Sequence, residues 1–291
     1  MEAEEQCTID SVLSAASLRG HDVGPRLLTD WVARGLLDHP QKRPLGHARG
    51  SLPAIYTPQQ RDLFLALLDK RRDGAKHIKT LAKIPIWFWL YYGDDWVPTR
   101  QVSRALKSWL GDYSVSTKAA ARDATAMIKQ FDHPDATLVA RRRLHLVLTE
   151  VAKKRRIVDR AGLERAVRDV FEPANVFGAV RRGAGPSAMP VSADGVVPLI
   201  EARLSSAHAI RGACLDEVFL NRARDEFRLG RAEYVRMLPH LRAQAGEQHA
   251  SMFYADTPES QLRDCANDFQ TLLGFMLLAA KREARAASSA P

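Results

Sequence analysis

Apolar residues recur at a spacing of three or four along most of this chain, whereas runs that alternate between apolar and polar residues are scarce. The first spacing places apolar side chains on one face of a helix. The pattern therefore predicts an all-α, mainly helical protein. The expected helices cover residues 8–19, 24–34, 58–73, about 75–83 (ending before Pro85), 99–110, 116–131, 136–156, 160–171, 198–211, 214–228, 231–245 and 257–286.

The helix expected over residues 24–34 lies in the sequence VGPRLLTDWVARGLL, residues 23–37. Pro25 suits its first turn, and Gly35 suits its end. Leu28, Trp31 and Val32 are spaced to face a core. The open side then presents Arg26, Thr29, Asp30, Ala33 and Arg34.

A basic loop with room for a short hairpin follows this helix. Residues 38–56 are rich in proline, glycine, histidine and arginine, and no acidic residue lies between positions 39 and 61. The preceding pair of short helices predicts a helix-turn-helix, whose second helix enters the major groove of DNA. A basic loop beside such a helix acts as a wing on the DNA backbone or minor groove. The wing residues are Lys42, Arg43, His47 and Arg49.

The order helix, turn, helix, basic loop, Tyr-Thr-Pro, helix resembles the winged helix-turn-helix of the MerR family. The resemblance rests on VGPRLLTDWVARGLL, which is similar to the family's recognition helix, and on IYTPQQRDLFLALLDKRRDG after the wing. It covers about residues 8–84. It implies binding to a specific site on double-stranded DNA and regulation of transcription. By this resemblance Arg26 contacts phosphate or a base, Arg34 contacts phosphate, and Arg43 and Arg49 belong to the wing.

The positive charge is concentrated in the middle of the chain. Residues 100–182 carry 18 basic and nine acidic side chains, an excess equal to the net charge of +9 of the whole chain. Such a field attracts polyanions such as nucleic acid. One basic cluster consists of Arg141, Arg142 and Arg143, and a second consists of residues 153–156. Two interpretations remain open: these clusters follow DNA phosphates, or they are solvated side chains whose stems cover a core.

Two apolar features have alternative interpretations as well. The aromatic side chains of residues 87–92 suggest a core between domains, with a ligand pocket or a surface for stacking bases as the alternative. In the last helix, Leu262, Phe269, Leu273 and Met276 recur at helical spacing. They favour either pairing between two subunits of a homodimer or packing within one subunit.

The 291 residues are enough for two or three domains. We expect a DNA-binding domain over 1–84, a basic helical domain over 85–182, a linker over 183–198, and a helical domain over 199–291. The last domain is expected to dimerise or to receive a signal. The linker is expected from its glycine, proline and serine content.

Several classes of protein are disfavoured by what the sequence lacks. It has no apolar run long enough to span a membrane, and its acidic first residues do not resemble a secretory signal. Cys7, Cys214 and Cys265 are far apart, which suggests thiols in a reducing cytoplasm. No metal-ligand spacing or nucleophile signature is present, so we expect no catalytic residue, metal or cofactor.

The favoured interpretation is a cytoplasmic, homodimeric, sequence-specific DNA-binding protein that regulates transcription. One alternative is an excisionase-like, replication or partition factor that bends or organises DNA with the same fold. The alternative from another class is a helical ligand-binding or protein-interaction module without specific DNA binding.

Overall fold

The computed structural model describes residues 7–44, 51–111, 116–131, 133–173, 192–249, 253 and 255–288. Most of these residues are helical, which confirms the prediction of a mainly helical protein, and the described strands lie between residues 7 and 56. None of the helices within the described ranges is long and apolar enough to cross a lipid bilayer.

The chain forms two compact units, and each consists of three separate stretches of sequence. The first unit contains Met1–Gly111, Ile210–Arg228 and Gln261–Asp268, and the second contains Asp112–Ala209, Leu229–Ser260 and Phe269–Pro291. These bounds differ from the predicted domains 1–84, 85–182 and 199–291. Residues 99–110, which the prediction assigned to a separate basic domain, pack inside the first unit, as described below.

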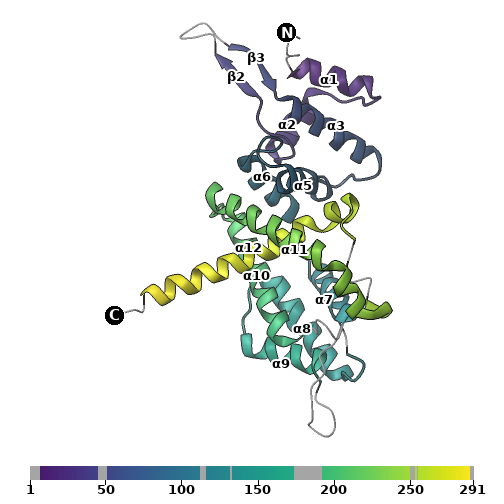
Figure 1. The fold of residues 1–291 in the computed structure, drawn as a ribbon, viewed down its shortest axis with the longest axis vertical. Coiled ribbons are helices and arrows are strands. Elements are labelled where there is room, and N and C mark those ends of the chain that lie inside the picture. Colours follow the sequence, from purple (N-terminus) through teal and green to yellow (C-terminus); the bar gives the residue numbers. More distant parts are fainter. Residues whose placement is uncertain are drawn as a thin grey trace. The chain divides into compact units, whose positions relative to one another are not determined.

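The first unit begins with a small antiparallel sheet and three helices. The sheet has the order β1-β3-β2, with Cys7 opposite Tyr56 and Arg43 opposite Leu52. The two strands of the hairpin expected within residues 38–56 are therefore present, and they lie side by side in Figure 1. The elements are β1 (Cys7–Thr8), α1 (Ile9–Leu18), α2 (Pro25–Ala33), β2 (Gln41–Pro44), β3 (Ser51–Tyr56) and α3 (Pro58–Arg72).

The helix α3 forms the core of this part of the unit. Thr57 caps it by accepting a hydrogen bond from the backbone N–H of Gln60 at 3.2 Å, which satisfies one free donor of the first turn. Its apolar face is buried, and Phe64 on that face meets Trp31 of α2 edge to face, with 5.4 Å between ring centroids. Burial of these two rings fixes α2 against α3.

The short helix expected over about 75–83 does end before Pro85, but a second helix that contains this proline was not expected. After α4 (Ile78–Leu81), the helix α5 (Lys83–Tyr92) starts, and Pro85 is its third residue. A proline is tolerated there because the first-turn N–H groups have no intrahelical acceptor. Trp89 of α5 is fully buried beside α6 (Thr99–Leu110), so it belongs to a core, but this core lies within the first unit and not between domains as expected. Tyr92, at the end of α5, is 53% exposed.

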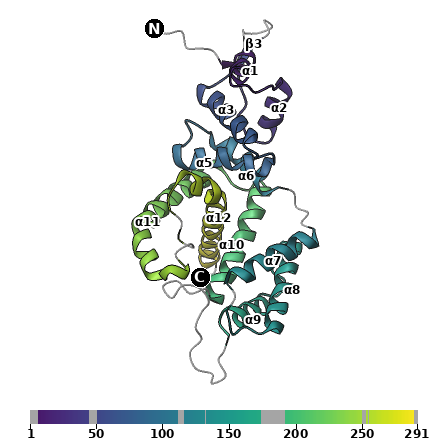
Figure 2. The same ribbon diagram turned by 90° about the vertical axis from the view of Figure 1, so that its right-hand side faces the viewer.

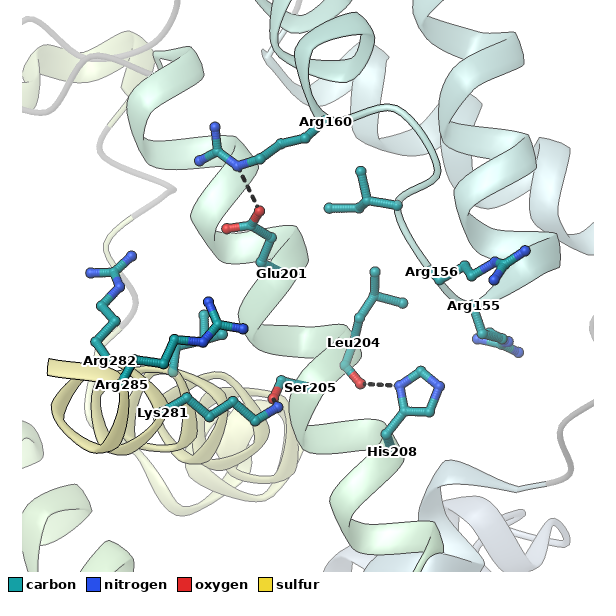
Figure 3. A pocket seen from close by; sticks show the side chains of 12 residues that line it. Arg155, Arg156, Arg160, Glu201, Leu204, Ser205, His208, Lys281, Arg282 and Arg285 are labelled. Carbon is teal, nitrogen blue, oxygen red and sulfur yellow. Dashed lines mark hydrogen bonds and ion pairs between the residues drawn. The ribbon is translucent and has the colours of Figure 1, made fainter. Parts of the chain in front are cut away.

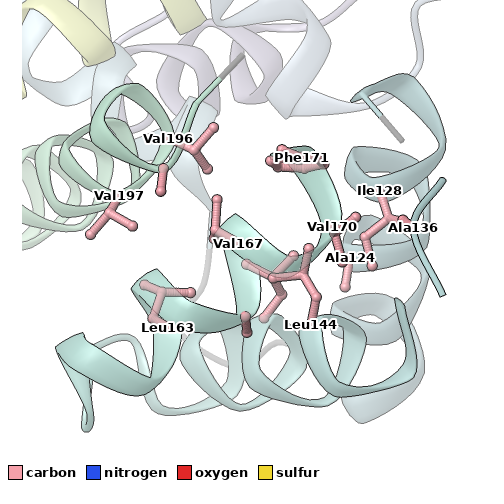
Figure 4. Packing of buried hydrophobic residues seen from close by; sticks show 13 residues of the cluster. Ala124, Ile128, Ala136, Leu144, Leu163, Val167, Val170, Phe171, Val196 and Val197 are labelled. Atoms are coloured by element: carbon pink, nitrogen blue, oxygen red, sulfur yellow. The ribbon is translucent and has the colours of Figure 1, made fainter. Parts of the chain in front are cut away.

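The second unit contains a three-helix core made of α7 (Thr117–Phe131), α8 (Leu138–Lys154) and α9 (Arg160–Phe171). These helices lie side by side in Figure 2. Leu144, Leu163, Val167 and Phe171 are fully buried where α8, α9 and the start of α10 (Ala193–Arg211) meet (Figure 4). Asp159 caps α9 through the backbone N–H of Gly162 at 2.8 Å.

Two further predictions about the C-terminal part need correction. The linker expected over 183–198 is helical from Ala193 onward, and its residues 183–191 lie outside the described residues. The helices expected over 214–228 and 231–245 form one helix, α11 (Glu217–His249), with Pro239 inside it. Packing of Leu238 and Ala245 with Phe253 offsets the local cost of this proline.

The last helix, α12 (Pro258–Ser288), uses part of its apolar face within the chain. Phe269 and Leu273 are fully buried. Gly274, in the second unit, lies against the backbone of Ala202 in α10. A Cβ atom on residue 274 would clash with the carbonyl group of Ala202. The described contacts therefore match packing within one subunit for these residues.

Candidate nucleic-acid interface

The helix α2 has one buried face and one exposed face. Leu28, Trp31 and Val32 are buried, which confirms the face that the spacing predicts. The exposed side chains are those of Arg26, Thr29, Asp30, Ala33 and Arg34. The N-cap is Gly24, which has no side chain to accept a first-turn N–H, but its carbonyl oxygen accepts from the backbone N–H of Leu27 at 3.1 Å.

The charges of the exposed face alternate along α2. Arg26 and Arg34 stand four residues before and after Asp30, so all three lie on neighbouring turns of one side. The hydroxyl of Thr29 donates to the carbonyl oxygen of Pro25 at 3.3 Å, and its oxygen remains an acceptor. This face therefore combines two cationic forks, one carboxylate and one hydroxyl, which are groups that can contact base edges and phosphates.

Two of the four predicted wing residues, Lys42 and Arg43, lie in the described part of the hairpin. Lys42 of β2 is exposed. Arg43 donates from Nε and Nη2 to the carbonyl oxygen of Pro53 in β3, at 3.0 and 2.9 Å, so its guanidinium ties the two strands together. His47 and Arg49 lie outside the described residues.

A buried network of amide groups holds the turn after α2. The side-chain oxygen of Gln60 accepts from the backbone N–H of Asp38 at 2.8 Å. Its amide nitrogen donates to the carbonyl oxygen of Trp96 and to the side-chain oxygen of Gln101, both at 2.9 Å. Gln101 in turn donates to the carbonyl oxygen of Leu36 at 3.0 Å. These bonds join α3 and α6 to the chain between α2 and β2.

Asp38 adds an ionic contact to this network. Its carboxylate is buried and accepts hydrogen bonds from Arg100 Nη2 at 2.7 Å and Arg104 Nη2 at 3.1 Å, both on α6. Burial raises the pKa of Asp38, but the hydrogen bonds from Arg100, the backbone N–H of His39 and Arg104 outweigh burial and hold this pKa below its usual value. The carboxylate is therefore charged at neutral pH.

Gly35 allows α6 to approach the end of α2. Its φ is +72°, a conformation that favours glycine. A Cβ atom at this position would lie 2.5 Å from the Cβ of Arg104 and from the backbone nitrogen of Ala105. Gly35 therefore ends the helix, as predicted, and also leaves the space that α6 occupies. This second role cannot be inferred from the local sequence.

The predicted basic cluster Arg141, Arg142 and Arg143 lies on α8 in the second unit. Arg141 donates to the carbonyl oxygen of His133 at 3.1 Å, and Arg143 is 3.8 Å from the carboxylate of Asp169. Arg142 is exposed and has no ion pair within the described part of the chain. Arg143 is exposed as well, so of the three Arg142 differs in having no ion pair within the described residues.

The residues that position α2 were not identified from the sequence, although one signal was present. Gln60 occurs three and four residues before the buried Leu63 and Phe64, so a polar side chain stands on the apolar face of α3. A buried amide needs hydrogen-bond partners, which Asp38 and Gln101 provide. Comparison of the chain with family models, curated proteins and solved structures gave no match.

Proposed function

We propose that the first unit binds double-stranded DNA as a winged helix-turn-helix, with α2 in the major groove and the β2–β3 hairpin as the wing. The observation that carries the proposal is the division of α2 into a buried apolar face and an exposed polar face, between a preceding helix and a hairpin. A recognition helix needs this division because it must be held rigidly on one side and read base edges with the other.

Each exposed group of α2 has a specific role in this proposal. Arg26 and Arg34 bind phosphate or the paired acceptors of guanine, for which a guanidinium fork is suited. Asp30 accepts a hydrogen bond from the exocyclic amine of cytosine, because a carboxylate is repelled by phosphate but fits that donor. Lys42 in the hairpin contacts the backbone, where a compact cation contributes affinity without sequence preference.

The resemblance to the MerR family supports a role in the regulation of transcription, with the protein acting as a homodimer. In the second unit, the exposed Arg142 adds a phosphate contact that is independent of sequence. Loss of this one contact should lower the slope of log affinity against log salt by about one.

The test is selection of bound duplexes from a random library by the full chain, followed by affinity measurements on the enriched sequence. Arg26→Ala and Arg34→Ala are expected to weaken binding by about five- to a hundredfold. Arg222→Ala is the matched control, because Arg222 is an exposed arginine on a helix, α11, of the same unit. Asp30→Asn should change the preferred base at one position of the selected site.

The possible outcomes separate the alternatives. An enriched site with two-fold symmetry supports a dimer, since the symmetry of a site mirrors that of the protein. Retention that is sensitive to salt but enriches no sequence would replace site-specific regulation with a DNA-organising role. If no duplex is retained, or if Arg222→Ala weakens binding as much as Arg26→Ala, the proposal fails.

A further inference from the structure

A basic cavity of about 620 Å³ lies wholly within the second unit. Three segments that are far apart in the sequence line it: the loop from the end of α8 to the start of α9, the middle of α10 and the last part of α12 (Figure 3). Its volume lies within the usual range for pockets that bind small molecules. A concave site of this kind suits a compact ligand more than the extended backbone of DNA.

The cavity is strongly basic. Six of the side chains that line it are basic, namely Arg155, Arg156, Arg160, Lys281, Arg282 and Arg285, and one, Glu201, is acidic. Glu201 accepts from Arg160 Nε at 2.8 Å, so the pair is neutral. Within the described residues, Arg156 and Arg282 have no carboxylate partner at salt-bridge distance. Positive charges held around a shared cavity repel one another, and a bound anion would remove this cost.

The backbone at one lining residue of the cavity, Arg155, has an unusual conformation. Arg155 ends α8 with φ +56° and ψ +25°, in the left-handed region that glycine or asparagine normally occupies. This turn leads the chain away from α8 and places Arg155, Arg156 and Ile157 in the lining. Strained conformations of this kind are found preferentially at functional sites.

The rest of the lining consists of apolar groups, one hydroxyl group and the imidazole of His208, whose Nδ1 lies 2.8 Å from the carbonyl oxygen of Leu204. Ile157, Leu204 and Leu278 come from the three different segments. Ser205 accepts a hydrogen bond from the ammonium group of Lys281 at 3.3 Å. A lining that combines cations with aliphatic side chains suits a molecule with both a phosphate group and an apolar organic part.

We infer that this cavity binds a small organic polyphosphate of the nucleoside di- or triphosphate class. The arginines hold the phosphates through charge-assisted hydrogen bonds, and the aliphatic side chains contact the organic part. The site belongs to the second unit alone, so this inference goes beyond the proposed binding of DNA and does not depend on it.

The test is titration of the full chain with ATP and with inorganic tripolyphosphate at fixed ionic strength, by calorimetry and by thermal unfolding. Arg155→Gly removes a cation and also relieves the backbone strain, so the variant is expected to fold. Arg282→Gln removes an exposed cation of α12. Each change is expected to raise the Kd for ATP by about tenfold or more.

Two further variants complete the test: one is expected to strengthen the binding of ATP, and the other is a control. Glu201→Gln removes the acidic group of the lining and leaves Arg160 with one carboxylate partner, Glu164 at 3.3 Å, so it should lower the Kd for ATP by several-fold. Arg122→Gln removes a side chain that is 79% exposed on α7 and does not line the cavity. This control should leave the Kd unchanged.

Saturable binding of one ATP per chain, with ATP bound more tightly than tripolyphosphate, is the expected result. Equal effects of Arg122→Gln and Arg282→Gln, or binding that does not saturate, would show unspecific attraction and overturn the inference. The inference is also overturned if ATP does not bind while Arg282→Gln, but not Arg122→Gln, weakens the binding of duplex DNA. In that case the cavity contacts phosphates of DNA.

Discussion

The side-chain amide of Gln60 donates to the side-chain oxygen of Gln101 at 2.9 Å, and both residues are buried in the first unit. This bond joins α3 to α6. Each glutamine also binds the backbone of the turn that follows α2, at Asp38 and at Leu36. The direction of the exposed face of α2 is thus fixed by buried amides that do not belong to this face.

We expect Gln60→Ala to destabilise the first unit by about 1–3 kcal/mol, because it leaves buried donors and acceptors at Asp38, Trp96 and Gln101 without their partner. Urea unfolding followed by tryptophan fluorescence measures the effect. Gln59→Ala is the control, since Gln59 is the preceding residue of the same helix and is not buried. Equal losses in the two variants would show that the buried amide network contributes nothing.

Asp38 should make the stability of the first unit depend on pH. Its pKa is lowered in the folded state, so its contribution is complete above the unfolded pKa of about 3.9 and disappears as the pH falls through the folded pKa. The difference in melting temperature between the native chain and Asp38→Asn should be constant from pH 7 to about pH 5 and shrink below about pH 4.

The control for this measurement is Asp62→Asn, because Asp62 is 48% exposed and pairs with its neighbour Arg61. An exposed pair of this kind contributes little to stability. A difference between Asp38→Asn and the native chain that does not change down to pH 2 would contradict the assigned role of Asp38.

Gly35→Ala should be more harmful than Gly20→Ala. Both glycines have a positive φ, +72° and +78°, so alanine costs about 1 kcal/mol at each from the backbone alone. Only Gly35 has α6 against it, and overpacking there should cost a further 1–3 kcal/mol or so. Thermal unfolding of the two variants compares them directly. Equal changes in melting temperature would show that α6 moves away without cost.

The three cysteines should differ in their reactivity toward a thiol reagent at pH 8. Cys214 is exposed, whereas Cys265 is buried, and burial raises the pKa of the Cys265 thiol to about 12. Since the thiolate is the reactive form, Cys265 should react only as the chain unfolds. Cys214→Ser should abolish the fast phase of labelling, and a fast phase that persists in this variant would place another thiol at the surface.

The parts of the fold that depend on nearby residues could be predicted from the sequence. The bounds and the buried face of α2 follow from Pro25, Gly35 and the spacing of Leu28 and Trp31, all within one short segment. The same holds for α3, with its cap at Thr57. These features depend on capping and periodicity, which are local properties.

Features that depend on distant partners could not be predicted in this way. Arg43 was expected at the DNA, but its guanidinium binds the carbonyl group of Pro53 across the hairpin. The continuity of α11 through Pro239 depends on packing with Phe253, and the cavity of the second unit needs three separate segments. Spacing within one helix carries no information about which distant segment will pack against it.

The first unit is assembled from stretches that the ribosome produces at very different times. The helix α5 is complete at Tyr92, yet Arg224 lies over the ring of Trp89, 5.0 Å from its centroid, and Gln261 accepts a hydrogen bond from the indole N–H of Trp87. These partners are synthesised more than 130 residues after α5. Helix α5 therefore cannot make these contacts while it emerges, and its final packing must wait until residue 261 has been synthesised.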